Sequence, residues 1–258
     1  LLVDYGLDRV NLFGPGILLD ATWYVISKKT KEDQIGTYFN ITQNQQEKFK
    51  QSSLEQAYDD LLNGRKNERI FLLPQEKLKI IEGYPFIYWF SNSFREKFKE
   101  KSISNYLRIC KGLTTADNER FLRYHWEIDR EDISEFYSLD NKRWVPFAKG
   151  GPYNKWYGNL WLLVDWDNEG FGIKNNLDSK GNLRSVIRNS EYYFKHGLTS
   201  SLSSSKGITF RELPQNHITE GACAGAFLIN DNLSIYYFLG LLNSNLVTFI
   251  AAALNSSV

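Results

Sequence analysis

The stretch WVPFAKGGPYNKWYGNLWLLVDW, residues 144–166, combines four tryptophans and two tyrosines with two lysines, and it holds no acidic residue before Asp165. Apolar runs at its two ends flank a Gly-Gly turn, which predicts a rigid hairpin. We expect Trp144, Trp161 and Trp166 to build a core, because aromatic side chains usually bury their large area. The lysines of the turn are better suited to contact a partner.

The region around this hairpin predicts an α+β protein. From residue 106 to 229, short apolar or aromatic runs alternate with Gly, Asn, Asp and Ser turns, a pattern typical of a mixed sheet with long connections. Periodicity and breaker residues predict helices at 44–63 and 233–254 and strands at 17–27 and 69–74.

Two segments need a closer reading. Ser93 and Glu96 have the spacing of a capping box, and the sequence between residues 90 and 98 places three phenylalanines on one helix face. The stretch 236–254 is uncharged, but Asn243 and its polar neighbours are costly in hydrocarbon, so a buried helix is expected rather than a membrane span.

The charge of the chain is concentrated in one region. The formal net charge is only +1, yet residues 142–211 hold eleven Lys and Arg against five Asp and Glu. Residues 212–258 hold three acids and no Lys or Arg. A nearly neutral protein with one basic third offers a local electrostatic surface to an anionic partner.

Common catalytic and metal motifs are absent from the sequence. It contains no G-x-S-x-G, GxxxxGK[ST] or H-E-x-x-H, and its three histidines are isolated. The stretch DWDNEG imitates half of an EF-hand loop, but Asn176 stands where a bidentate Glu is required, so a polar turn is expected. No catalytic residue and no metal site are therefore predicted. Two distant cysteines suit buried thiols in a reducing, cytoplasmic compartment.

Several long motifs occur together and in a fixed order. They are KGLTTADNERFLRYHWEI, RWVPFAKGGPYNKWYGNLWLLVDWDNEG, NSEYYFKHGLTSS, KGITFRELP and YYFLGLLNSNLVTFIAAALNSS. In this order they resemble the C-terminal target-recognition half of adenine-specific DNA methyltransferases. The likeness is to the PglX type of the BREX phage-defence systems and to TaqI-like specificity domains of restriction–modification enzymes, and it runs from about residue 69 to the end.

The resemblance implies a division into three parts. Residues 1–35 would be the edge of a methyltransferase domain, with the last strands of its Rossmann-like sheet. Residues 36–105 would form a helical and strand connector, and residues 106–258 a mixed-sheet DNA target-recognition domain with flanking helices, closed by a C-terminal helix. The family's Asn-Pro-Pro-aromatic tetrapeptide and glycine-rich cofactor loop are absent. The chain itself is thus expected to be inactive and to bind no cofactor, whereas the parent enzyme would use S-adenosylmethionine for adenine-N6 methylation.

Sequence-specific DNA binding needs cations for phosphates, polar side chains for base edges and a rigid platform. The basic third supplies all three. The predicted contact residues are Lys111, Thr114, Thr115, Asn118, Arg120, Lys149, Gly150, Gly151, Asn154, Lys155, Lys174, Arg184, Arg188, Lys195, Ser204, Ser205 and Lys206. Further cations are Lys180 and Arg211, and further possible adenine readers are Asn159, Asn175, Asn176 and Asn189.

Alternatives remain open at three places. The polar residues of KGLTTADNER suit base reading and turn capping equally well. The serine-rich stretch 200–207 suits either phosphate contact or a plain surface connection. The expected partners are double-stranded DNA and an upstream methyltransferase domain, and no membrane is expected. There are two rival functions: a separate specificity subunit, and a protein-interaction module with an aromatic hot spot.

Overall fold

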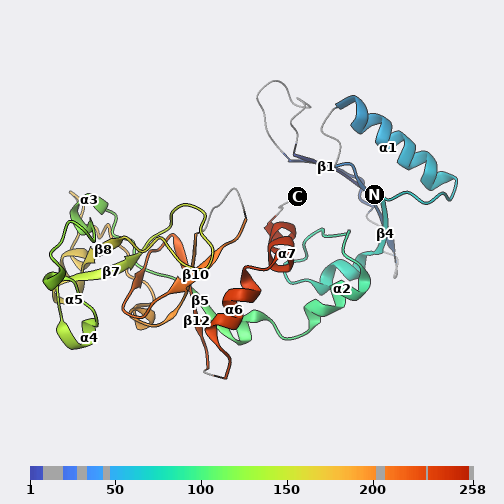
Figure 1. Ribbon diagram of the computed structural model, residues 1–258. Coiled ribbons are helices and arrows are strands. Elements are labelled where there is room, and N and C mark those ends of the chain that lie inside the picture. The colour runs from blue at the N-terminus through green and yellow to red at the C-terminus, as the bar shows by residue number, and fades with distance from the viewer. Residues whose placement is uncertain (8–19, 28–33, 43–46, 202–206, 231, 256–258) are drawn as a thin grey trace. The chain divides into compact units, whose positions relative to one another are not determined.

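A computed structural model of the protein describes residues 1–7, 20–27, 34–42, 47–201, 207–230 and 232–255. The chain forms two compact units, one made of Leu1–Lys101 with the residues from Ala253 onward, the other of Ser102–Ala252. Each unit combines helices with strands (Figure 1), so the predicted α+β class is confirmed.

The first unit contains a four-stranded sheet of order β2-β1-β3-β4. The strands are β1 (Leu2–Leu7), β2 (Asp20–Tyr24), β3 (Ile35–Asn40) and β4 (Ile70–Pro74). β1 runs antiparallel to β2 and parallel to β3, and β3 runs antiparallel to β4. β4 confirms the strand predicted at 69–74, and β2 falls within the strand predicted at 17–27, of which 17–19 lie outside the described residues.

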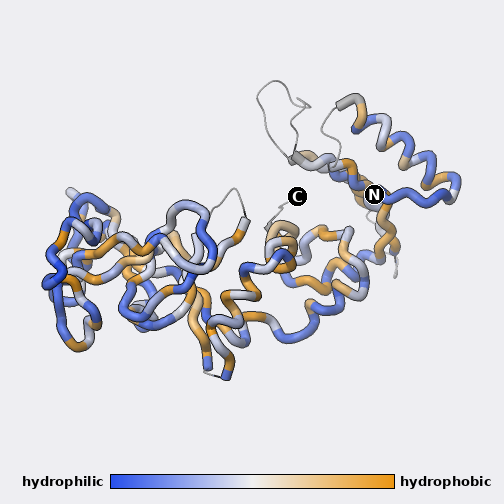
Figure 2. Tube along the Cα trace, viewed as in Figure 1, coloured by the Kyte–Doolittle hydropathy of each residue, from blue (hydrophilic) through white to orange (hydrophobic). Residues whose placement is uncertain are grey.

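Helices cover both faces of this sheet, because successive strand residues point to opposite sides. One face packs on α1 (Glu47–Leu62), the helix predicted at 44–63, through the cluster Val3, Phe39, Ile41 and Ala57. Apolar positions recur along this otherwise hydrophilic helix (Figure 2). The other face packs on the short helix η1 (Gln75–Ile80) and the segment after it, through Leu2, Tyr38, Leu73, Leu78 and Tyr88.

The predicted phenylalanine cluster forms, but its cap differs from the prediction. The rings of Phe90, Phe94 and Phe98 lie 4.8–6.0 Å apart around α2 (Asn92–Glu96) and η2 (Lys97–Lys99). The N-cap is Ser91, whose hydroxyl accepts from the Phe94 N–H at 3.2 Å. Ser93, predicted as the cap, lies inside the helix. The sequence offers two serines within one turn, and the extended backbone at Ser91 decides between them.

The second unit begins with η3 (Ile103–Asn105) and contains two four-stranded sheets. The first sheet is antiparallel with order β10-β9-β12-β5. Its strands are β5 (Leu107–Lys111), β9 (Gly197–Ser201), β10 (Phe210–Leu213) and β12 (Cys223–Leu228). Leu107, Leu198 and Ala226 of these strands pack against Phe238 and Leu239 of α6 (Ile235–Leu242), which covers one face.

The second sheet has the order β11-β7-β8-β6. Its strands are β6 (Leu122–Tyr124), β7 (Trp144–Ala148), β8 (Leu162–Asp165) and β11 (Ile218–Thr219). The antiparallel pair β7–β8 confirms the predicted hairpin. The short helices around it are α3 (Asn118–Phe121), η4 (Arg130–Asp132), α4 (Tyr137–Asp140), α5 (Asp167–Lys174) and η5 (Ser190–Tyr192). Residues 168–170 adopt left-handed backbone, so DWDNEG forms the expected polar turn.

The two sheets meet where β5 leaves the first and passes β11. The Leu113 N–H donates to the Thr219 carbonyl at 2.8 Å, and the Glu220 N–H donates to the Ala148 carbonyl at 2.9 Å. A Cβ at Gly112 would lie 1.9 Å from that Thr219 oxygen, so only glycine allows this approach. The core of the second sheet then continues directly from Leu113.

The prediction of a single C-terminal helix at 233–254 is wrong. The chain forms α6 and then α7 (Asn245–Asn255), with a bend of 64° between them. Asn243 is the C-cap of α6: its main-chain N–H and its side-chain NH₂ both donate to the Leu239 carbonyl, and its side chain also bonds to Phe210 of β10. Among the described residues, neither helix alone is long and apolar enough to cross a membrane; only the bent pair together has the required length and composition.

Candidate nucleic-acid interface

The hairpin divides its aromatic residues between core and surface. Trp144 and Trp166 are 8% and 5% exposed, as expected, and Trp161 is half-buried. Trp156 and Tyr157, in the loop between β7 and β8, are 53% and 63% exposed. Main-chain bonds of Trp156 to Phe210 and Glu212 hold this loop against the edge of β10. The exposed rings are therefore presented by a fixed backbone.

The predicted contact residues at the start of the loop are paired with a carboxylate. Nζ of Lys149 lies 3.3 Å from Oε1 of Glu220, and the Gly150 N–H donates to Oε2 of the same side chain at 3.4 Å. The exposed fractions of the two side chains are 26% and 18%. Part of the positive charge of Lys149 is therefore neutralised within the protein.

The next predicted contacts shape the loop. Nζ of Lys155 donates to the main-chain oxygen of Asn243 at 3.0 Å, at the C-terminal end of α6, where a positive charge is favourable. Asn154 donates to Oδ1 of Asn159, which is 4% exposed, and Asn159 donates in turn to the Pro152 carbonyl. A Cβ at Gly151 would lie 3.1 Å from the Asn159 amide, so this glycine packs against it.

The structure brings the two halves of the predicted contact set together in an antiparallel ladder. Thr114 and Val186 form a bridge in which each N–H donates to the other's carbonyl at 2.8 Å. Side chains of the second segment add three hydrogen bonds around this single bridge: Asn189 donates to the Lys111 carbonyl, Ser185 to that of Thr115 and Arg184 to that of Ala116. We call these residues, 111–116 and 184–189, the cationic ladder.

The segment 184–189 of the cationic ladder carries two arginines, one on each side of the bridging residue Val186. Arg184 and Arg188 are exposed, whereas Ser185 is buried, as strand alternation requires. Lys111 is exposed at the end of the ladder. Within the described part of the chain, none of these three cations has a carboxylate within ion-pair distance.

In the turn after the ladder, some predicted readers serve the fold. The Thr115 hydroxyl donates to Oδ1 of Asn118 at 2.8 Å, and Thr115 is 4% exposed. Asp117 caps α3 by accepting the Arg120 N–H. The capping interpretation of KGLTTADNER therefore holds for Asp117, whereas Thr115 bonds to a side chain. Asn118 and Arg120 are exposed, and the guanidinium of Arg120 lies over the Phe121 ring at 4.8 Å.

Other predicted residues fall into three groups. Lys174, 3.8 Å from Glu169, and Lys195, 5.2 Å above the Tyr192 ring, are exposed cations. The prediction of Arg211 as a phosphate contact is wrong, because its side chain is 0% exposed and donates to the Ser201 hydroxyl. Asn176 is 2% exposed and donates to the Thr115 carbonyl, so it is equally unsuited to read bases. The remaining predicted residues, Ser204, Ser205 and Lys206, lie outside the described residues.

An open cavity of about 580 Å³ adjoins the turn after the ladder. Predicted residues Asn118, Lys149 and Gly150 line it together with Tyr124 and Trp161. The sequence prediction missed Tyr124 and its neighbour Trp126, whose rings stack with centroids 4.5 Å apart and planes at 7°. The sequence did contain a signal for this pair, because two aromatic residues stand two positions apart at the end of a short strand. Only the structure shows that their side chains are 43% and 63% exposed.

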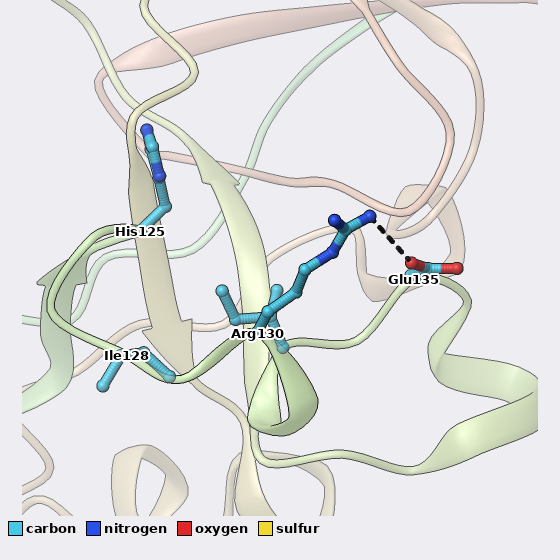
Figure 3. Close-up of a pocket in the computed structure, with 5 residues that line it drawn as sticks. His125, Ile128, Arg130 and Glu135 are labelled. Carbon is cyan, nitrogen blue, oxygen red and sulfur yellow. Dashed lines mark ion pairs between the residues drawn. The ribbon is translucent and has the colours of Figure 1, made fainter.

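A second, smaller cavity of about 330 Å³ lies beside His125. Ile128, Arg130, Ile133 and Glu135 complete its lining (Figure 3). Arg130 and Glu135 form a loose ion pair of 3.9 Å whose side chains are 93% and 75% exposed. Among the described residues, no group of three or more His, Cys, Asp or Glu side chains is placed to hold a metal ion. Both cysteines are free and buried, as expected.

The geometry defines an α+β unit with a cationic ladder and an adjoining aromatic cavity. Comparison with known proteins finds sequence similarity to adenine-specific methyltransferases. The chain is 30% identical to the adenine-specific methyltransferase PglX of Lacticaseibacillus casei (strain Zhang) over 237 residues, 89% of this chain and 19% of that protein. It is 32% identical to the adenine-specific methyltransferase BrxX of Escherichia coli O9:H4 (strain HS) over 182 residues, 69% of this chain and 14% of that protein. No family model matches the chain.

These similarities confirm the coarser part of the resemblance. Most of the chain is related to a segment of adenine-specific methyltransferases, while the chain spans about a fifth or less of the length of these curated relatives. What the segment contributes to such an enzyme has to be argued from its own residues.

Proposed function

We propose that this chain is the DNA target-recognition part of an S-adenosylmethionine-dependent adenine-N6 DNA methyltransferase of a phage-defence or restriction–modification system. The second unit, Ser102–Ala252, binds double-stranded DNA and selects the adenine. Methyl transfer belongs to a catalytic domain of the parent enzyme, which extrudes the adenine from the duplex. The relation to PglX and BrxX supports the enzyme class, and the cationic ladder supports the role in recognition.

The cationic ladder is the observation that carries this proposal. The segment that carries Lys111 and the segment that carries Arg184 and Arg188 are about seventy residues apart in the sequence, and the Thr114–Val186 bridge joins them. All three cations are exposed. In the described part of the chain, no carboxylate lies within ion-pair distance of these cations. Arginine suits this role because its planar guanidinium donates two parallel hydrogen bonds to phosphate or to a guanine edge.

A small residue stands beside one of the cations. Ala116 is exposed, and the guanidinium of Arg184 donates to its carbonyl. The hairpin loop adds exposed Tyr157 and Trp156 from a fixed backbone.

Salt dependence of duplex binding tests the proposal. For Arg184→Ala and Arg188→Ala in the 258-residue chain, we expect weaker binding to every duplex and a salt slope smaller by roughly one unit each, because each phosphate contact releases about one counterion. The matched control is Arg130→Ala, which removes the same charge from an exposed position of the same unit. Fluorescence anisotropy titrations of a labelled duplex at several salt concentrations give both quantities.

Two outcomes would contradict the proposal. One is an equal loss of affinity in the control, which would show that only net charge matters. The other is binding that does not change with salt, which would instead favour a protein-interaction module built on the aromatic loop.

A further inference from the structure

Tyr124 and Trp126 form an exposed aromatic pair that packs nothing in the described core. Their rings lie parallel, with centroids 4.5 Å apart, and they are 43% and 63% exposed. Leu122, at the start of the same strand, is 8% exposed in the main core cluster of the second sheet. The strand β6 thus turns from core to surface within three residues. A preformed stack with a free outer face is the surface on which a planar ligand stacks.

The cavity of about 580 Å³ begins at this pair, because Tyr124 is part of its wall. Trp161 supplies a second aromatic wall, and its carbonyl accepts the N–H of His125, which fixes the two segments to each other. The volume lies within the range of about 300–1,000 Å³ found for small-ligand sites. Aromatic walls at this size suit a flat ligand of one or two rings.

Some polar side chains of the cavity lining are hydrogen-bonded to the main chain of its rim, and others have hydrogen-bond donors available for a ligand. Glu127 accepts the Tyr124 N–H, and Arg123 donates to the carbonyls of Glu119 and Leu122, so these side chains hold the rim. Asn118 accepts from Thr115 through Oδ1, and within the described residues its NH₂ group has no hydrogen-bond partner.

Lys149 provides further donors, since its ammonium has three and the ion pair with Glu220 uses one direction. Donors beside aromatic walls fit a nucleobase, which has two flat faces and acceptors along its edge. The cavity also adjoins the cationic ladder. Asn118 follows the ladder residue Ala116 by two positions and is hydrogen-bonded to Thr115 within the ladder. A DNA backbone held at Arg184 would therefore pass next to the cavity.

We propose that this cavity receives one unstacked nucleobase of the bound DNA, held against the Tyr124–Trp126 pair. This inference rests on the proposed function, because the base arrives only on a bound duplex. The pair offers a stacking surface that every base satisfies, while Asn118 and Lys149 meet the base edge and its phosphate.

The test compares three DNA probes: a fully paired duplex, the same duplex with one unpaired base, and the same duplex with a 2-aminopurine as the unpaired base. We expect the 258-residue chain to bind the unpaired-base duplex about tenfold more tightly than the paired one, within the range for base–aromatic stacking. Binding should also quench the 2-aminopurine fluorescence, because stacking on an aromatic ring quenches this base.

The decisive variants are Trp126→Ala and Tyr124→Ala, which change exposed side chains. Each should abolish the tenfold preference and the quenching while changing affinity for the paired duplex less than twofold. The matched control is Tyr237→Ala, since Tyr237 is a 59% exposed aromatic on α6 in the acidic C-terminal stretch and should leave the preference intact.

The possible failures are distinguishable. Absence of binding to any duplex overturns both the proposed function and this inference. Binding to the paired duplex without a preference, or a preference that survives Trp126→Ala, overturns the inference and leaves the proposed function standing.

Discussion

Asn243 closes the open edge of strand β10 by hydrogen bonding to both main-chain polar groups of Phe210. Its Oδ1 accepts the Phe210 N–H at 3.0 Å, and its Nδ2 donates to the Phe210 carbonyl at 2.8 Å. The asparagine is 4% exposed, so water has little access to replace either bond. The Asn243 side chain shares this edge of β10 with the hairpin loop, whose Trp156 N–H also donates to the Phe210 carbonyl, and Asn243 is at the same time the C-cap of α6.

The first prediction is that Asn243→Ala lowers the free energy of unfolding by about 1–3 kcal/mol, the cost of one unsatisfied buried group. The buried N–H of Phe210 would lose its partner, whereas the Phe210 carbonyl would still accept the Trp156 N–H. Urea denaturation measures the change. The control Asn175→Ala removes an exposed asparagine that bonds only within its own helix and should cost less than about 1 kcal/mol. Equal losses in both variants would show that the Phe210 contacts are dispensable.

A second prediction concerns the partial neutralisation of Lys149 by Glu220. We expect Glu220→Gln to strengthen binding to paired duplex DNA several-fold and to make the salt dependence steeper, because the ammonium becomes available to a phosphate. Glutamine retains an oxygen that can accept the Gly150 N–H, so the loop should keep its conformation. Lys149→Ala should weaken binding to all duplexes equally. An unchanged salt slope in Glu220→Gln would mean that Lys149 makes no phosphate contact even when released.

A third prediction concerns the pH dependence of stability. Burial lowers the pKa of His217 below its ordinary value of 6.5. Below about pH 6.5 the unfolded chain takes up a proton that the folded protein resists, so stability is complete above that pH and decreases as the pH falls toward the folded-state pKa. His217→Gln should therefore flatten the stability profile between about pH 7 and 5. An unchanged slope in His217→Gln would contradict this prediction and assign the pH dependence of stability to other groups.

The fourth prediction follows from the motifs that the sequence lacks. The 258-residue chain should neither bind S-adenosylmethionine nor methylate DNA, because the Asn-Pro-Pro-aromatic tetrapeptide and the glycine-rich cofactor loop are absent. Calorimetric titration with the cofactor should show no binding heat, and radiolabelled cofactor should transfer no methyl group to a duplex. A clear micromolar isotherm would refute this. A cofactor-binding methyltransferase serves as the positive control.

Local patterns predicted much of the fold because they depend on neighbouring residues. The helix α1 and the strand β4 follow from apolar spacing and the terminating Pro74, and the β7–β8 hairpin follows from apolar runs around a turn. The motif order led to the relation with adenine-specific methyltransferases. These inferences required no knowledge of which distant residues meet.

The state of each charged side chain could not be predicted in this way. The sequence determined that residues 142–211 are basic, but Lys149 is paired with Glu220 and Arg211 is fully buried. Ion pairing and burial depend on residues distant in the sequence, which only packing brings together. For the same reason the break at Asn243 was missed, since its partner Phe210 lies thirty-three positions away.

The sequence by itself determined the α+β class, the basic region and the likeness to methyltransferases. Only the tertiary structure decided that the segment of Lys111 and Thr114 lies beside the segment of Arg184 and Arg188, because the bridge between Thr114 and Val186 joins stretches distant in the sequence. It also decided that Tyr124 and Trp126 face outward beside a cavity while Trp144 and Trp166 are buried. Trp144 and Trp166 adjoin apolar runs of the sequence, whereas Tyr124 and Trp126 alternate with polar residues. The final exposure of each ring depends on the part of the sheet to which its residue belongs.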